Sequence, residues 1–303
     1  MKKLVLLGVV ALLNACGGGG GNTSTPPMIT TVPFTSFSAV QANQAVTFSG
    51  GMSAVVTGTN NGTTVTSISP VNIDTTSTTG TLTYGVNRGL SAVSVVTPSA
   101  SISFSSTGAG NTFNCTSGVC GLTSTSASAI VIEPTTSPLG WNYQTFGVWE
   151  RSTSTTSFDA GAFSFGSLTP ASAIPTTGTA TFNGLANGFF VDNTSTAFFT
   201  TANMTANVDW VARSIGFSTS NTRQVSLTAP SSAGVLNTGL NFTGTLTYLA
   251  GTNAFSGPVN TTGSTMTGTA TGRFYGPNAD EMGGAFSLGG SAGTMMGGFG
   301  GKR

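Results

Sequence analysis

The sequence predicts an all-β protein in which a β-rich N-terminal domain precedes an eight-stranded antiparallel β-barrel. Composition is the first reason. The 303 residues include 43 glycines and 20 phenylalanines, are rich in threonine, serine and asparagine, and are only 6% charged. Threonine and phenylalanine suit pleated strands, while glycine and asparagine suit the tight turns between them. The second reason is a strict alternation of apolar and polar side chains in three segments after residue 177.

Charge and histidine content exclude several functions. The formal net charge is +1, and it becomes −1 without Lys2 and Lys3, because seven basic residues then face eight acidic ones. The sequence has no basic patch of the kind that nucleic-acid binding requires. It also has no histidine, which is the commonest general base and metal ligand. We therefore expect no nucleic-acid partner, no metal and no cofactor.

Residues 1–15 have the features of a bacterial lipoprotein signal peptide. Two lysines precede an apolar run of ten residues, Leu4 to Leu13, which is too short to cross a bilayer as a stable helix. Leu13-Asn14-Ala15-Cys16 then resembles a lipobox, in which the cysteine becomes the first mature residue and carries the lipid. Asn14 is unusual there, and an ordinary secretory leader with a chance cysteine is the alternative. Cys16 is the predicted lipidation site.

Residues 16–33 predict a flexible tether between the lipid and the folded body. Five consecutive glycines, residues 17–21, are followed by asparagine, serine, threonine and proline. No aspartate follows Cys16, which fits sorting to the outer membrane. We expect the protein to be anchored there through its lipid, on the cell surface.

Four residues separate the two remaining cysteines, Cys115 and Cys120, in the chain. In an exported protein such a pair predicts a disulfide. A metal site and free thiols are the alternatives. Asn114, Thr116 and Ser117 would be poor metal ligands, which weighs against the first of these.

Residues 34–138 predict a first, β-rich domain whose topology the sequence leaves open. Short strand-like segments at residues 45–48, 80–84, 101–104 and 129–132 are separated by Ser/Thr/Asn/Gly segments such as residues 57–66. Residues 135–140, with a proline and a glycine, predict the boundary to a second domain at residues 139–303.

The second domain shows the clearest alternation. The apolar faces are Gly178, Ala180, Phe182 and Gly184; then Leu240, Phe242, Gly244, Leu246 and Tyr248; then Met266, Gly268, Ala270, Gly272 and Phe274. The intervening residues are threonine, asparagine and Arg273, so one face predicts core and the other solvent. The recurring glycines favour strong curvature, or aromatic rings lying over glycines of neighbouring strands. Such a sheet tends to close into a barrel.

An integral outer-membrane barrel is the alternative use of such strands. Its apolar band would face lipid. A lipobox would be redundant on such a barrel, and the apolar faces contain glycine and alanine where leucine and valine would be expected. We therefore favour a barrel with its apolar face inside.

The segment 272–287, GRFYGPNADEMGGAFS, resembles the barrel signature of transferrin-binding protein B. The matching residues are Gly272, Phe274, Tyr275, Gly276, Pro277, Glu281, Gly283, Gly284 and Phe286. Residues 297–303, GGFGGKR, resemble the final strand of that family, and residues 143–150 resemble its opening barrel strand. The resemblance frames residues 140–303. It implies a handle-like first domain and a barrel that serves as scaffold.

Within this motif, residues 276–278 predict a tight turn, because proline fixes φ and asparagine tolerates unusual φ. We expect Glu281 to accept hydrogen bonds from backbone N–H groups of its own hairpin or to pair with Arg273. A functional carboxylate is the alternative. Phe274, Tyr275, Phe286 and Phe299 alternate along strands, which is more typical of core than of a ligand cage.

The resemblance implies a surface lipoprotein that binds a ligand, a protein or peptide carrier in iron or nutrient acquisition, and passes it to an outer-membrane transporter. A TonB-dependent receptor and a surface-lipoprotein translocon would be its partners. A structural or adhesive surface lipoprotein is the alternative. We expect no enzyme, because nucleophile–base pairs and phosphate-binding loops are missing from the sequence. The paired phenylalanines Phe189, Phe190, Phe198 and Phe199 are candidate ligand contacts, since one of each pair must face outward on a strand.

Overall fold

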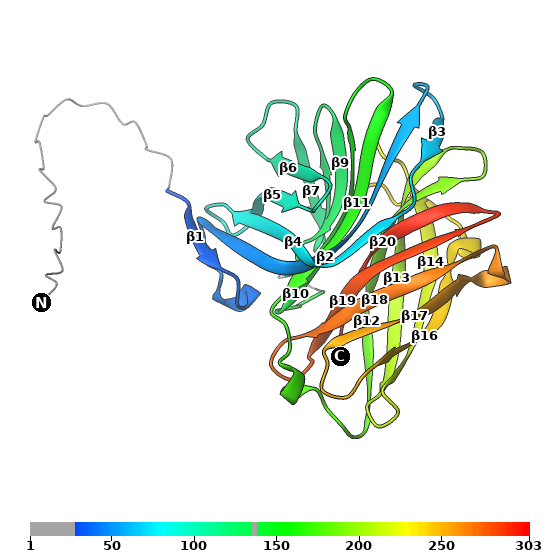
Figure 1. The fold of residues 1–303 in the computed structure, drawn as a ribbon. Helices are drawn as coiled ribbons and strands as arrows, with labels where there is room; N and C mark the ends of the chain where they lie inside the picture. The colour runs from blue at the N-terminus through cyan, green and yellow to red at the C-terminus, as the bar shows by residue number, and fades with distance from the viewer. Residues whose placement is uncertain (1–27, 135–137) are drawn as a thin grey trace, which may run out of the picture.

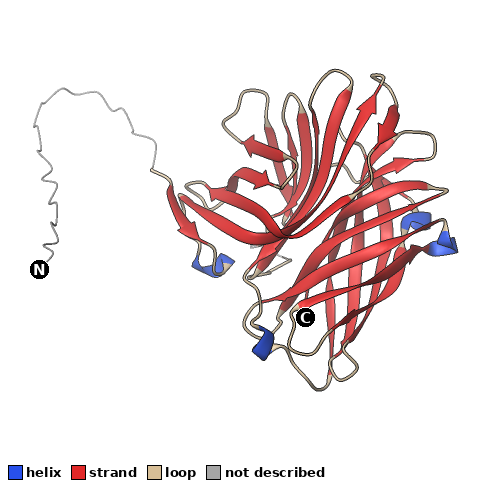
Figure 2. Cartoon of the chain, in the orientation of Figure 1, coloured by secondary structure: helices blue, strands red, loops and turns tan. Residues whose placement is uncertain are grey.

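The computed structural model describes residues 28–134 and 138–303, which form two β-sheets with only four single turns of 3-10 helix between the strands (Figures 1 and 2). The all-β prediction is confirmed. The signal peptide, Cys16 and most of the tether lie outside the described residues, as does part of the predicted boundary, residues 135–137. Within the described residues, no helix has the length and apolar character to span a membrane.

The first sheet is curled and contains eleven strands. They are β1 (Thr30–Pro33), β2 (Gln44–Asn60), β3 (Val65–Ile68), β4 (Asn72–Tyr84), β5 (Leu90–Val96), β6 (Ser101–Ser105), β7 (Thr112–Thr116), β8 (Val119–Thr123), β9 (Ala127–Ile132), β10 (Gln144–Ser152) and β11 (Ser157–Gly166). The order along the main path is β6-β5-β4-β2-β11-β10-β9-β8-β7, with β1 and β3 pairing with β2. The strand segments predicted at 45–48, 80–84, 101–104 and 129–132 lie in β2, β4, β6 and β9.

The second sheet closes into a barrel. Its strands are β12 (Thr179–Asp192), β13 (Ala197–Asp209), β14 (Ser214–Val225), β16 (Phe242–Tyr248), β17 (Ala254–Thr261), β18 (Met266–Tyr275), β19 (Glu281–Gly290) and β20 (Gly293–Lys302), with the short β15 (Val235–Leu236) beside β14. Consecutive barrel strands pair antiparallel, and β20 returns to pair with β12. The eight-stranded antiparallel barrel is therefore confirmed.

The alternation along the barrel strands sorts side chains to its two faces. The predicted apolar faces, for example Phe182, Phe242, Leu246 and Phe274, join one buried cluster that fills the interior. The threonines between them face outward and are mostly exposed. A barrel with its apolar face inside is thus observed, as the favoured interpretation requires.

Aromatic rings lie over glycines inside the barrel, as the recurring glycines predicted. A Cβ at Gly272 would lie 2.5 Å from the ring of Phe255 on β17. A Cβ at Gly284 would lie 2.7 Å from the ring of Phe299 on β20. Because glycine leaves this space free, a strongly curved sheet can enclose large rings without cavities.

The boundary predicted at residue 139 is wrong in one respect. The segment 143–150 was expected to open the barrel, but β10 pairs with β9 and β11, and β11 pairs with β2. Both strands therefore belong to the first sheet, and the barrel sheet begins at β12. The reason is that β10 and β11 carry apolar residues on both faces and are largely buried on both, so they can pair with the first sheet and still pack against the barrel. The segment predicted to separate strands at residues 57–66 is also shorter, because β2 continues to Asn60 and β3 begins at Val65.

The two sheets pack face to face, as Figure 1 shows for β10 and β11 beside β19 and β20. A buried apolar cluster fills the layer between them. It contains Ala54, Val56, Ile130, Val148, Phe158, Ala160 and Ala162 from the first sheet, and Phe189, Val191, Phe199, Val225, Ala285 and Met296 from the barrel. The layer has two ends. The closed end holds the motif at residues 272–287, and the loop end holds the tips of three hairpins.

Candidate functional site

The motif at residues 272–287 forms the end of β18, a turn and the start of β19 at the closed end. Alternate residues of the motif lie in two different environments. Phe274 and Phe286 point into the barrel core. Tyr275 and Glu281 are almost fully buried outside the barrel, against the first sheet. The expectation that the motif aromatics are core is confirmed.

Glu281 joins the two sheets through three backbone hydrogen bonds. Its carboxylate accepts from the N–H groups of Asn142, Tyr143 and Gln144, at 2.5, 2.9 and 3.0 Å. Burial raises the pKa of Glu281, while these three N–H donors and the Lys302 ammonium lower it. The capping role is confirmed, but the capped groups lie in the approach to β10, not in the hairpin of Glu281.

Arg273 takes another partner. Its guanidinium donates to the carbonyl oxygen of Thr75 at 2.9 Å, so the predicted pairing with Glu281 is wrong. The reason is geometry: on a strand pair, Arg273 lies opposite Gly283, two positions beyond Glu281. The turn also differs in detail, since the positive φ values fall on Gly276 (+86°) and Ala279 (+59°), not on Asn278.

Glycines let β10 and β11 approach the barrel closely at the closed end. A Cβ at Gly283 would lie 2.8 Å from both Gln144 Oε1 and Ser164 Oγ. A Cβ at Gly300 would overlap the side-chain amide of Gln144. The glycines of the motif therefore serve the contact between the two sheets as well as the barrel interior.

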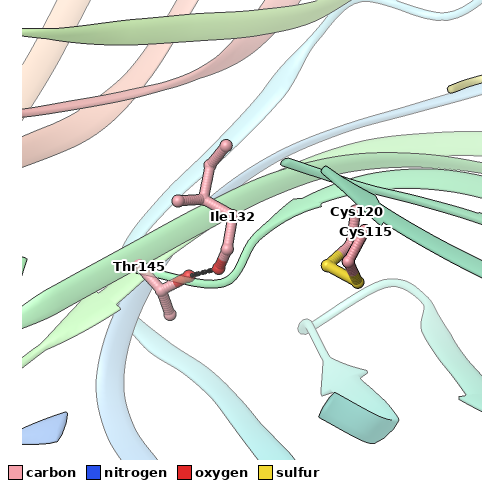
Figure 3. Close-up of a disulfide and its surroundings, with 4 residues drawn as sticks. All are labelled: Cys115, Cys120, Ile132 and Thr145. Carbon is pink, nitrogen blue, oxygen red and sulfur yellow. Dashed lines mark hydrogen bonds between the residues drawn. A yellow bond between two sulfur atoms is a disulfide. The ribbon is translucent and has the colours of Figure 1, made fainter. Parts of the chain in front are cut away.

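The predicted disulfide is present in the hairpin of β7 and β8 (Figure 3). Cys115 and Cys120 are opposite each other in the strand register, and their sulfurs are 2.04 Å apart. Cys120 is fully buried beside β9. Nearby, the Thr145 hydroxyl donates to the carbonyl oxygen of Ile132 at 2.5 Å, which fastens the end of β9 to β10. These features stabilise the first sheet.

Three hairpin tips gather at the loop end, on the upper side of Figure 1. They are residues 60–65 between β2 and β3, 152–157 between β10 and β11, and 192–197 between β12 and β13. Backbone hydrogen bonds tie them together. The N–H of Asn60 donates to Thr156 O at 2.9 Å, and the N–H of Val65 donates to Ser195 O at 2.8 Å. The second bond joins the first sheet to the barrel.

The tips line an open cavity of about 820 Å³, which we call the loop-end cavity. Phe158 and Phe189 form an apolar wall, with ring centroids 5.8 Å apart, and Leu227 adds a third apolar side chain. Hydroxyl groups of the tips, such as Thr64 and Ser152, form the rim. A concave site with an apolar wall and a few polar groups is typical of ligand binding.

Among the described residues that line the loop-end cavity, Glu150 is the only charged one. It is half-buried near the end of β10, between Ser128 of β9 and Ala160 of β11 in the strand register. Burial raises its pKa to about 7. Among the described residues, none forms a hydrogen bond or ion pair with its carboxylate. The adjacent Arg151 pairs with Asp159 at 2.8 Å on the opposite face of the strand.

The four phenylalanines predicted as ligand contacts are not exposed contacts. Phe189 and Phe199 face outward from the barrel, as the alternation required, but the first sheet covers them. Phe190 lies in the barrel core, and Phe198 packs against it. The expectation that one of each pair is exposed is wrong, because the first sheet covers the outer face of β12 and β13. Ligand contact by these residues stays a prediction. Phe189 alone reaches the wall of the loop-end cavity.

Glu150 and Phe158 were not among the site residues predicted from the sequence. Glu150 stands at the end of an apolar strand, Phe146 to Trp149, where a charged residue is unexpected. That position is a signal that sequence reasoning can find. The distance in the chain between Phe158 and Phe189 hides their contact, which only the packing of the two sheets creates.

Comparisons with known proteins agree with the barrel topology. Residues 174–303 match a family model described as the C-lobe and N-lobe beta barrels of Tf-binding protein B. The match includes the motif at 272–287 and the final strand, and begins after β10 and β11. No curated protein matches the sequence.

Several solved structures are similar to this chain. Transferrin-binding protein B from Haemophilus parasuis is 15% identical over 74% of this chain and 51% of its own, with a TM-score of 0.42. The protein from Neisseria meningitidis is 20% identical over 75% of this chain and 52% of its own, with a TM-score of 0.40. The N-lobe of lactoferrin-binding protein B from Moraxella bovis is 16% identical over 53% of this chain and 75% of its own, with a TM-score of 0.36.

This chain therefore spans about half the length of the first two of these structures. The sequence motifs, the closed eight-stranded topology and the family model agree on one domain. The chain carries, over residues 174–303, a transferrin-binding protein B-like β-barrel domain.

Proposed function

We propose that this protein is a lipoprotein anchored to the outer membrane that binds a protein or peptide ligand and delivers it to an outer-membrane transporter. The observation that carries the proposal is the match of residues 174–303 to the barrels of a binding protein. The loop-end cavity supports it, because tips of both sheets meet there around one concave surface. The proposal is of a binder and not of an enzyme.

In this proposal, a lipid on Cys16 anchors the protein, and the folded domains lie on the cell surface. A tether at residues 16–33 would hold the folded sheets away from the membrane, so that the hairpin tips can reach a large ligand. A TonB-dependent receptor is the proposed recipient of the ligand, and a surface-lipoprotein translocon the proposed export partner. The relatives' names motivate transferrin-like or other iron-carrying proteins as the first ligands to test.

The test is capture of ligands by the immobilised full chain from the growth environment, with and without iron loading, followed by mass spectrometry. We expect one protein or peptide to be retained at sub-micromolar affinity. A matched pair of variants places the site. Thr155→Trp fills the rim of the loop-end cavity, and Leu249→Trp puts the same ring on the exposed turn at the opposite end of the barrel. Thr155→Trp should abolish retention and Leu249→Trp should not.

Two outcomes contradict the proposal. Equal retention by both variants would move the binding site away from the loop end. If no soluble ligand is retained and the chain binds only surfaces or other cells, the protein is an adhesive or structural lipoprotein.

A further inference from the structure

The loop-end cavity contains a carboxyl group, that of Glu150, with no hydrogen-bond or ion-pair partner among the described residues. Glu150 reaches it from β10, and its register neighbours Ser128 and Ala160 bring no positive charge. The nearest basic residue in sequence, Arg151, is held on the other face by Asp159. A half-buried carboxylate without a partner is costly in the free protein, and a cationic ligand would remove that cost.

The wall beside Glu150 fits the uncharged part of a long cationic side chain. The largely buried rings of Phe158 and Phe189, with centroids 5.8 Å apart, line the cavity, and Leu227 extends the apolar surface. Lysine and arginine combine an aliphatic stem with a charged head, so the stem can lie on apolar surface while the head meets a carboxylate. Aromatic rings add a cation–π attraction for either head group.

We propose that the loop-end cavity takes a lysine or arginine side chain of the protein ligand, with its cationic head paired to Glu150 and its stem against Phe158 and Phe189. This inference rests on the proposed function, since it names the part of the ligand that enters the cavity. Ser152 and Thr64 at the rim are placed to accept further hydrogen bonds from the peptide that bears the side chain.

The test uses the full chain and four capped tripeptides, Gly-Xaa-Gly, in which Xaa is lysine, arginine, norleucine or glutamate. Norleucine keeps the stem of lysine and removes its charge. Titration calorimetry at pH 8 should show lysine and arginine peptides binding at least tenfold more tightly than norleucine, with the glutamate peptide weakest. Glu150→Gln should remove the preference for the cationic peptides. Asp280→Asn, which removes a carboxylate at the closed end, should leave that preference unchanged.

Three outcomes would overturn the proposal. The norleucine peptide binds as tightly as the lysine peptide, the Glu150→Gln protein keeps the cationic preference, or free spermidine binds and the peptides do not. The last outcome would make the cavity a site for small amines. Failure of the proposed function is distinguishable. If a captured protein ligand binds the Glu150→Gln protein unchanged, the proposed function stands and this inference fails. If cationic peptides bind but no ligand is captured, this inference stands and the proposed function fails.

Discussion

Glu281 and Glu150 both lie in the layer between the sheets, and they differ in their hydrogen-bond partners. At the closed end, Glu281 accepts hydrogen bonds from three backbone N–H groups of residues 142–144. At the loop end, Glu150 faces a cavity and has no partner among the described residues. The first carboxylate is part of the scaffold, because it holds the approach to β10 against β19. The oxygens of the second have no hydrogen-bond partner among the described residues, so they are available to a ligand.

The surroundings of the two glutamates follow the same division. Near Glu281, glycines bring β10 within contact of the barrel, and the Lys302 ammonium donates to Gly140 O at 2.7 Å. Near Glu150, a backbone hydrogen bond from the N–H of Val65 to Ser195 O joins the two sheets, and the hairpin tips leave a cavity. One end is therefore built for rigidity, and the other presents polar loops on a rigid base, which is where binding sites are commonly found.

Removing the Glu281 carboxylate should have the largest effect on stability. Glu281→Ala leaves three N–H groups without an acceptor in a buried site, and each such loss costs about 1–3 kcal/mol. We expect the free energy of unfolding to fall by about 3 kcal/mol or more, measured by urea unfolding at pH 7. Glu281→Gln, whose amide oxygen still accepts hydrogen bonds, should lose less. Equal stability of wild type and Glu281→Ala would show that Glu281 does not join the sheets.

Replacing Glu150 should raise the free energy of unfolding, whereas replacing Glu281 lowers it. The carboxylate has a pKa of about 7 in the folded protein against a usual value of about 4.5, so the folded state binds the extra proton. Wild-type stability should therefore fall as pH rises from about 4.5 to about 7, and Glu150→Gln should remove this loss. At pH 8 the variant should be more stable by up to about 3 kcal/mol, from about 1.4 kcal/mol for each pKa unit.

The measurement is thermal or urea unfolding of both proteins between pH 4 and pH 8. The two curves should coincide at pH 4 and separate progressively toward pH 7. A wild type that is more stable than Glu150→Gln at pH 8 would mean that the carboxylate has a stabilising partner, and the contrast with Glu281 would disappear.

Removing the disulfide should cost about 2 kcal/mol, the value that loop-closure entropy gives for so short a loop. The double replacement Cys115→Ala and Cys120→Ala changes the β7–β8 hairpin, away from the three tips of the loop end. Urea unfolding should register the loss, while ligand binding at the loop end should stay within twofold of wild type. A larger change in binding would show that the hairpin position controls the cavity.

A pair of glycine variants should give the smallest effect on stability and compare the packing at the two ends of the layer between the sheets. Gly283→Ala puts a methyl group 2.8 Å from Gln144 Oε1 and Ser164 Oγ at the closed end. We expect a loss of about 1–2 kcal/mol from overpacking. Gly289→Ala, on the same strand near the loop end, meets nothing within 4 Å and should be neutral in the same unfolding experiment. Similar costs for both would contradict close packing specific to the closed end.

Much of the fold follows from the sequence, because alternation is a local property of a strand. Residues such as Phe242, Leu246 and Phe274 are apolar at every second position, and a pleated strand places them on one face whatever the topology. The motif at residues 272–287 likewise predicted the barrel. It predicted that Glu281 caps backbone N–H groups, but placed those groups in its own hairpin and not at residues 142–144. The cysteine spacing predicted the disulfide. These inferences need no knowledge of which strand lies beside which.

Only the tertiary structure decided what the outward faces of the strands contact. β10 and β11 carry apolar residues on both sides, so their sequence fits either sheet, and only the pairing of β11 with β2 settles the choice. The same packing buried Phe189 and Phe199, which alternation had placed outside the barrel. It also brought Phe158 beside Phe189 and left Glu150 without a partner among residues 28–134 and 138–303. Contacts between residues far apart in the chain depend on the packing of whole sheets, and a local pattern carries no record of it.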